Sequence, residues 1–127
     1  MLAQKKGPVS VRELAGREFL TLGHGHKFTT VVKNLASLAG ATTSGSYEGT
    51  SLDAIRQMAS MGESIAVLPS LYAISEAKRD PLLIVRPINH TQAQRQISLM
   101  WRETSPMAAK FSTIGRVFED VANQIMT

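Results

Sequence analysis

The residues best suited to chemistry lie in one glycine-rich segment, residues 23–30, which reads GHGHKFTT. Glycines let a backbone approach a ligand closely. The N–H groups and the dipole at the start of a helix favour an anion, by roughly 0.3 to 1 kcal/mol per charge at an exposed terminus. Lys27 would stand in the first helical turn, where a cation opposes the dipole. It therefore either extends into water beside a structural turn or meets a bound anion.

The histidines allow a second kind of chemistry. His24 and His26 are two residues apart and could both reach one metal ion, with His90 as a third ligand. A usable site needs three or four ligands, and no Asp or Glu lies near the pair in sequence. We therefore expect no metal and no cofactor, with one histidine hydrogen-bonded to backbone and the other exposed.

Patterns typical of enzymes are missing from the sequence. It contains no cysteine, no Gly-x-Ser-x-Gly elbow, no Gly-Lys-Ser/Thr phosphate loop and no full Gly-x-Gly-x-x-Gly. Glu119 and Asp120 adjoin on a predicted helix and point in different directions, so they do not form a carboxylate pair. We expect a non-enzymatic protein.

A nucleic-acid interface is not predicted either. The chain is basic, with a formal charge of +4, and six of its basic residues lie in positions 1–33 against two acidic ones. Lys5, Lys6, Arg12 and Arg17 are nevertheless scattered, and no helix-turn-helix can be drawn. If the protein regulates genes, its DNA contacts lie elsewhere.

The composition is that of one ordinary soluble domain, with 127 residues, 43% hydrophobic and 19% charged. No apolar run reaches 18 residues, and the N-terminus lacks the apolar stretch of a secretory signal. We expect a cytoplasmic location and no membrane partner. The absence of cysteine excludes disulfides, Cys-ligated zinc and thiol catalysis.

Hydrophobic periodicity predicts the elements that would position the glycine-rich segment. Residues 1–9 look like a tail or a connection. Helices are expected at residues 28–39, ending at Gly40, at 52–61, with Thr50 or Ser51 as N-cap, and from Ser105 and Pro106 to residue 125. Buried or half-buried strands are expected at residues 18–22, 42–48, 65–68, 82–85 and 97–101. Strands alternating with helices imply an α/β domain with a largely parallel sheet.

Taken in order, several motifs resemble the effector-binding domain of LysR-type transcriptional regulators, and most of all its OxyR-type branch. The resemblance covers about residues 2–125. The motifs that carry it are Leu14-Ala15-Gly16 leading into Phe19–Leu22, Gly25-His26, Thr50-Ser51-Leu52, Met61-Gly62 with Ile65–Pro69, and Gln96–Pro106 with Trp101, Arg102 and Ser105-Pro106.

The resemblance implies a sensor domain like a type II periplasmic binding protein, a Rossmann-like three-layer α/β sandwich with the effector held between two subdomains. Residues 1–91 would be the second, effector-binding subdomain with an N-terminal connection. Residues 92–127 would return to the first subdomain as a strand and the C-terminal helix. Regulators of this type bind DNA through a separate N-terminal domain and assemble as homodimers or tetramers.

One departure from the OxyR-type pattern is decisive. Those sensors carry a peroxide-reactive cysteine directly after the Gly-His pair, where this chain has Lys27, and a resolving cysteine nine residues on, where it has Ala36. Peroxide sensing by disulfide formation is therefore impossible. We expect a small anionic effector instead, contacted by residues of the turn and of the next helix start, namely His26, Lys27, Thr29, Thr30, Thr50 and Ser51.

Two rival interpretations share the α/β fold. A solute-binding protein of a transport system would need an export signal upstream, and none is visible. A small α/β enzyme working through His24 or His26 would need a partner acid or nucleophile, and none is found.

Overall fold

The computed structural model describes residues 2–23, 25–49, 51–62 and 64–126, with side chains for all of these except residues 3 and 45–49. The chain divides into two compact units, residues 1–94 and residues 95–127. The assignment of these pieces to two different subdomains of a larger sensor stays a prediction.

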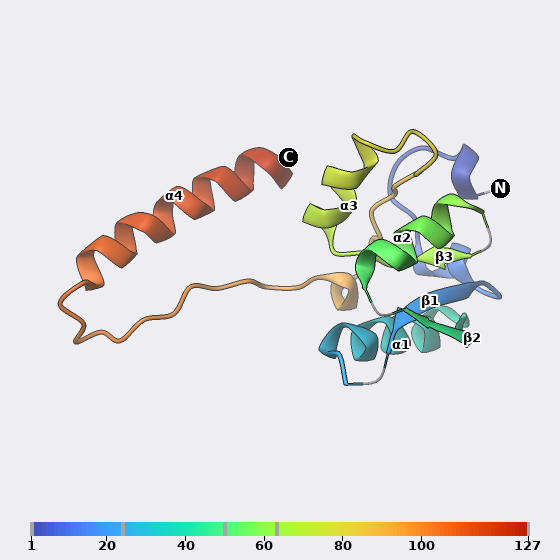
Figure 1. Ribbon diagram of the computed structural model, residues 1–127, viewed down its shortest axis with the longest axis horizontal. Helices are drawn as coiled ribbons and strands as arrows, with labels where there is room; N and C mark the ends of the chain where they lie inside the picture. Colours follow the sequence, from blue (N-terminus) through green and yellow to red (C-terminus); the bar gives the residue numbers. More distant parts are fainter. Residues whose placement is uncertain (1, 24, 50, 63, 127) are drawn as a thin grey trace. The chain divides into compact units, whose positions relative to one another are not determined.

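The first unit alternates strands and helices, as the periodicity predicts. Figure 1 shows this order along the chain. Its elements are the short 3-10 helices η1 (Leu2–Gln4) and η2 (Val11–Leu14), then β1 (Glu18–Leu22), α1 (Lys27–Ala39), β2 (Thr42–Gly49), α2 (Leu52–Ser60), β3 (Ile65–Ala66), α3 (Ser70–Ala77) and the 3-10 helix η3 (Thr91–Ala93).

The three strands form a parallel sheet in the order β2-β1-β3, so β1 is central. Successive side chains of a strand point to opposite faces. Phe19 packs against Val32 and Leu35 of α1, whereas Leu20 packs with Ile55 of α2. Helices therefore cover both faces of the strand (Figure 1), which confirms the predicted α/β class with a parallel sheet.

Local signals set the ends of the helices that follow β1 and β2. Gly40 adopts φ 70° directly after α1, a left-handed conformation that costs glycine little and other residues more. The side chain of Ser51 accepts a hydrogen bond from the Ala54 N–H at 3.2 Å, which makes Ser51 the N-cap of α2. Both helices lie where the sequence predicts them.

The predicted strand at residues 82–85 is wrong. The segment is not a strand, and Leu82 and Ile84 are mostly exposed. Pro81 and Pro87 flank the run and have no N–H group to give to a ladder. Only Ile88 pairs, in one parallel bridge to Val9.

The described residues of the second unit, 95–126, contain one helix, α4 (Ala108–Met126), preceded by an extended segment. The predicted strand at residues 97–101 is also wrong, because this segment has no pairing partner in the described part of the chain. Its Trp101 ring packs against Phe111, with the ring centroids 6.3 Å apart. The helix begins three residues after the predicted start at Ser105, whose hydroxyl accepts a hydrogen bond from the Met107 N–H in the turn before α4.

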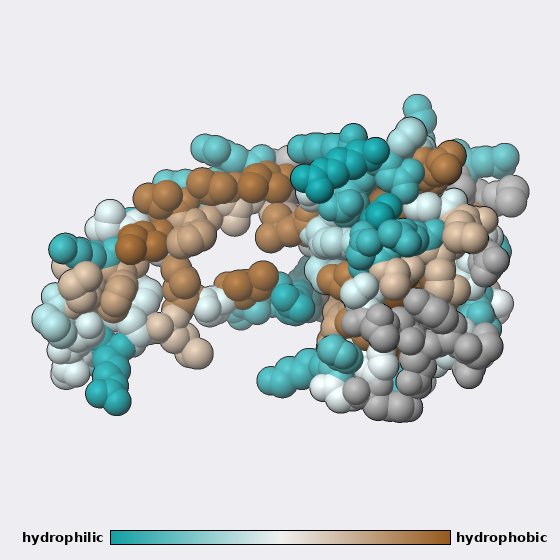
Figure 2. All heavy atoms as spheres, in the orientation of Figure 1, coloured by the Kyte–Doolittle hydropathy of each residue, from teal (hydrophilic) through white to brown (hydrophobic). Residues whose placement is uncertain are grey.

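Many large apolar side chains of this unit are exposed, and Figure 2 shows hydrophobic atoms along α4 and along the segment before it. They are Ile97, Leu99, Met100, Trp101, Met107, Ile114, Val117, Phe118, Val121, Ile125 and Met126. Among the described residues, no helix is both long and apolar enough to cross a membrane.

Two further segments differ from the sequence-based expectation. Helix α3, which follows Pro69, was not predicted. Residues 1–9 are expected to be a tail or a connection, and the packing contradicts only a free tail, because Val9 is 5% exposed within the core and Leu2 packs against the same cluster. Arg86 also holds this segment through hydrogen bonds.

Candidate functional site

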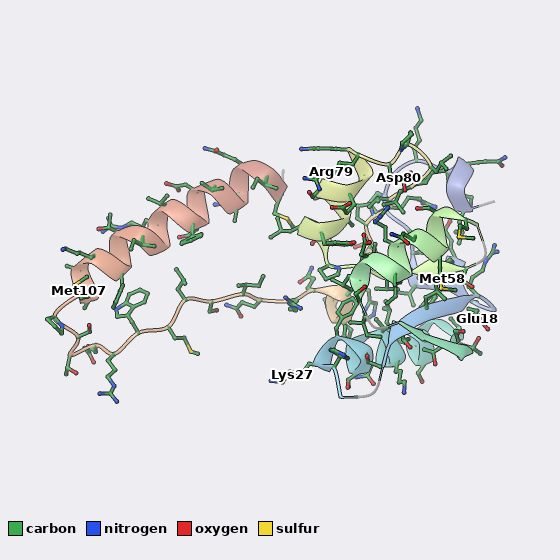
Figure 3. The ribbon with its side chains drawn as sticks, in the orientation of Figure 1. Glu18, Lys27, Met58, Arg79, Asp80 and Met107 are labelled. Carbon is green, nitrogen blue, oxygen red and sulfur yellow. The ribbon has the colours of Figure 1, made fainter. Side chains whose placement is uncertain are left out.

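The turn from β1 to α1 forms a surface hollow of about 210 Å³. The first turns of α1 supply most of its wall. Its lining residues are Gly25, His26, Lys27, Thr29, Thr30 and Lys33. Figure 3 shows the Lys27 side chain reaching outward from the start of α1, away from the sheet. Four of the six residues predicted as effector contacts therefore share one hollow.

Thr29 fixes this turn from beneath. Its side chain is buried, and its hydroxyl group lies 2.9 Å from the Leu22 carbonyl oxygen and 3.0 Å from that of Gly23, to which it donates. These bonds join the end of β1 to the first turn of α1. Because its proton is engaged by the backbone, Thr29 acts here as a positioning residue whose main contacts are internal.

The charged side chains of the hollow, Lys27 and Lys33, lie on its exposed rim. His26 is the N-cap of α1, and its side chain makes no capping hydrogen bond. The first turn contains no acidic residue, and Lys27 opens it. Gly25 has φ +92°, a conformation that L side chains rarely adopt, so the tight bend before His26 requires glycine. The hollow thus combines a helix N-terminus with two lysines.

Lys33 is a lining residue that the sequence analysis did not single out. It follows Lys27 and Thr30 at steps of three residues along α1. On a helix, residues three apart are neighbours, so these side chains form one ridge. That spacing is the signal from which Lys33 could have been predicted.

The remaining predicted contacts are not part of this hollow as described. Ser51 caps α2 and does not line the hollow. Thr50 and His24 lie outside the described residues. His90 caps η3, where its Nδ1 accepts a hydrogen bond from the Gln92 N–H at 3.1 Å. In the part of the chain that is described, no group of three His, Cys, Asp or Glu side chains could hold a metal ion.

A separate polar network joins α2 to α3 and to the turn after it. The Arg56 guanidinium, at 14% exposure, contacts Asp53 at 2.9 Å, Asp80 at 3.1 Å and Glu76 at 3.7 Å. Hydrogen bonds from Arg56 lower the pKa of Asp53, and the same pair raises the pKa of Arg56. Burial raises the pKa of Tyr72, whose hydroxyl donates to Asp53. Each of these groups contacts at least one other member, either Arg56 or Asp53, so the network stabilises the packing of the helices.

A comparison with known protein families finds a match that agrees with the α/β arrangement of the first unit. The LysR substrate binding domain matches residues 1–122. The chain belongs to this family. The LysR substrate-binding domain implies an α/β fold like that of periplasmic binding proteins, and the small parallel sheet is consistent with it. The family is one of transcription regulators, and its matched domain is regulatory.

Curated relatives of this LysR domain are regulators of the OxyR type. The DNA-binding transcriptional dual regulator OxyR of Escherichia coli K12 is 30% identical over 106 residues, which are 84% of this chain and 34% of the relative. A hydrogen peroxide-inducible genes activator of Haemophilus influenzae is 24% identical over 122 residues, which are 96% of this chain and 40% of the relative. The chain thus spans only 34% and 40% of the lengths of these relatives. No solved structure matches it significantly.

Proposed function

We propose that this chain is the effector-sensing part of a LysR-type DNA-binding transcriptional regulator, and that it binds a small anionic molecule. The fold would be of the type II periplasmic-binding-protein kind, with residues 1–91 as the effector-binding subdomain and residues 92–127 as the return segment. Membership of the LysR family and the parallel sheet of the first unit support the proposal.

The hollow at the start of α1 is the observation that supports an anionic effector. Two lysines, Lys27 and Lys33, line it together with a helix N-terminus whose first turn has no acidic residue. Both the helix dipole and the ammonium groups favour negative charge there. An anion also explains why a lysine stands in a helical turn where the dipole alone disfavours it.

The size of the hollow limits the ligand. A volume of about 210 Å³ is below the roughly 300 to 1,000 Å³ of drug-sized pockets. It suits a phosphate or a carboxylate of a few carbons. The hollow would form one wall of the effector cleft, and the first subdomain would supply the other. Thr30 and His26 would contact the anion from the rim, and Thr29 would hold the turn in place. Thr50 and Ser51 stay predicted contacts that this hollow, as described, does not include.

Some relatives are named for hydrogen peroxide-inducible genes, but peroxide sensing by disulfide formation cannot be transferred from them to this chain. The chain has no cysteine. Ala36, at the position of the resolving cysteine, is buried in the core nine residues beyond Lys27. At 1.5 Å rise per residue the two positions are about 13.5 Å apart along the helix axis. The turn therefore serves recognition of a bound molecule rather than thiol chemistry.

The proposed cellular location, assembly and DNA contacts are those expected for a LysR-type regulator. The protein would act in the cytoplasm without catalysing a reaction and would assemble as a homodimer or tetramer. It would contact DNA only through an N-terminal domain separate from these residues.

Calorimetric titration tests the ligand class. Succinate, citrate and inorganic phosphate are titrated into the chain, into Lys27→Ala and into the control Lys78→Ala, which removes an exposed lysine next to α3. Loss of a charge-assisted contact should weaken binding of the preferred anion about tenfold in Lys27→Ala, and the control should bind like the parent. Identical binding by Lys27→Ala and the parent would remove Lys27 from the site.

A further inference from the structure

One guanidinium group holds the N-terminal segment of the first unit. Arg86 Nε donates to the Gly7 carbonyl at 2.8 Å, Nη1 to the Leu2 carbonyl at 3.0 Å and Nη2 to the Pro8 carbonyl at 3.0 Å. These acceptors are 78 to 84 residues away in sequence. In the described part of the chain Arg86 makes no ion pair, so its donors serve neutral carbonyls.

The same two segments are joined again immediately beyond Arg86. Val9 and Ile88 form a parallel bridge, in which the Val9 N–H donates to Pro87 at 2.8 Å and the Asn89 N–H donates to Val9 at 3.0 Å. Val9 is buried in the core, and Ile88 packs against the same cluster. Residues 2–9 and 86–89 therefore form one continuous contact, which we term the latch.

The latch lies where the chain leaves the first unit. Beyond Asn89 come His90, the short helix η3 and then the unit boundary between Gln94 and Arg95. Residues 86–89 are thus held by contacts with the N-terminal segment across more than 75 residues of sequence, whereas η3 packs against the core cluster through Ala93.

We infer that the latch opens and closes as a single cooperative element, with Arg86 as the residue that fastens it. The fork of a guanidinium supplies several donors in fixed directions, which one ammonium group cannot reproduce. Opening releases three carbonyls to water and exposes Val9, while Phe19 and the packing of α1 stay intact. Such local openings occur at lower free energy than global unfolding. Release of the N-terminal segment then frees residues 86–89 as well, independently of any ligand at the hollow, while η3 keeps its packing against the core through Ala93.

Hydrogen exchange of individual backbone amides, followed by NMR at increasing urea, tests this inference. The reporters for the latch are the Val9 and Asn89 amides, and those for the core are Val32 and Leu35. The variants are Arg86→Gln and Arg86→Lys. The control Arg79→Gln removes the same charge from an exposed guanidinium whose ion pair with Glu76 is 3.5 Å long.

In Arg86→Gln the Val9 and Asn89 amides should exchange at least about tenfold faster, with core amides changed less than about twofold, because local opening leaves the core folded. Arg86→Lys should fall between Arg86→Gln and the parent, and Arg79→Gln should match the parent. Unchanged latch amides, or equal acceleration of latch and core amides, would overturn the inference.

The parent chain alone gives a second test that does not depend on the folding of any variant. If the latch opens as one element, the Val9 and Asn89 amides share one opening free energy and one urea dependence, both smaller than those of the core amides. Different urea dependences for the two latch amides would overturn the inference.

Discussion

Thr29→Val removes one hydroxyl group at the base of the candidate site and keeps the shape of the side chain. The parent hydroxyl donates to the carbonyls of Leu22 and Gly23 from a buried position. A net hydrogen bond is worth about 0.5 to 1.5 kcal/mol, and the carbonyls lose a shared donor, so the expected loss is about 1 to 2 kcal/mol. Thr and Val have similar helix propensities, which leaves the hydrogen bonds as the main difference.

Thermal unfolding followed by circular dichroism at 222 nm measures this loss. For a unit of 60 to 100 residues, 1 kcal/mol corresponds to roughly 4 to 8 °C, so Tm should fall by about 4 to 16 °C. Thr29→Ser keeps the donor and should recover most of the stability. Thr30→Val changes the exposed neighbour and should lie within about 0.5 kcal/mol of the parent. A Thr29→Val chain as stable as Thr30→Val would refute the positioning role of Thr29.

Three other perturbations follow from the fold. Gly40→Ala places a Cβ on a residue at φ 70°, so backbone strain should destabilise the first unit by about 1 to 2 kcal/mol in urea unfolding. An unchanged urea midpoint would contradict strain at this position. Gly115→Ala, whose added Cβ would meet Leu99 at an ordinary 3.7 Å, should instead strengthen α4 by about 0.5 to 1 kcal/mol, seen as higher helicity. The Ser10 backbone N–H, and then Lys5, lower the pKa of Glu13 from 4.5 to about 2, so its stabilising effect is complete above pH 4.5 and is lost as pH falls toward 2. Between pH 5 and pH 2 the free energy of unfolding should therefore depend less on pH for Glu13→Gln than for the parent. The same pH dependence in both chains would exclude this effect.

The order of elements in the first unit could be predicted because its signals are local. The apolar run of β1, the helical spacing of α1 and the terminal Gly40 are read within a few residues. Residues 82–85 show where such reasoning ends. An apolar run indicates a strand only if another strand is present to pair with it, and pairing is a property of the whole fold.

The candidate site shows the same division between local and distant information. Lys27 could be singled out because its charge conflicts with the start of a helix. The role of Thr29 could not, because its partners are carbonyls six and seven residues away across a turn. The hold of Arg86 on the N-terminal segment spans most of the first unit and has no signature in the local sequence.

Chemical-shift mapping tests the central claim most directly. The ¹⁵N-labelled chain is titrated with succinate, citrate and inorganic phosphate in turn, and each backbone amide is followed by NMR. The account predicts that at least one anion produces saturable shifts largest at the amides of Lys27, Phe28 and Thr30, and that Lys27→Ala weakens them. Saturable shifts centred elsewhere, or none with any of the three anions, would contradict an anionic effector at the start of α1.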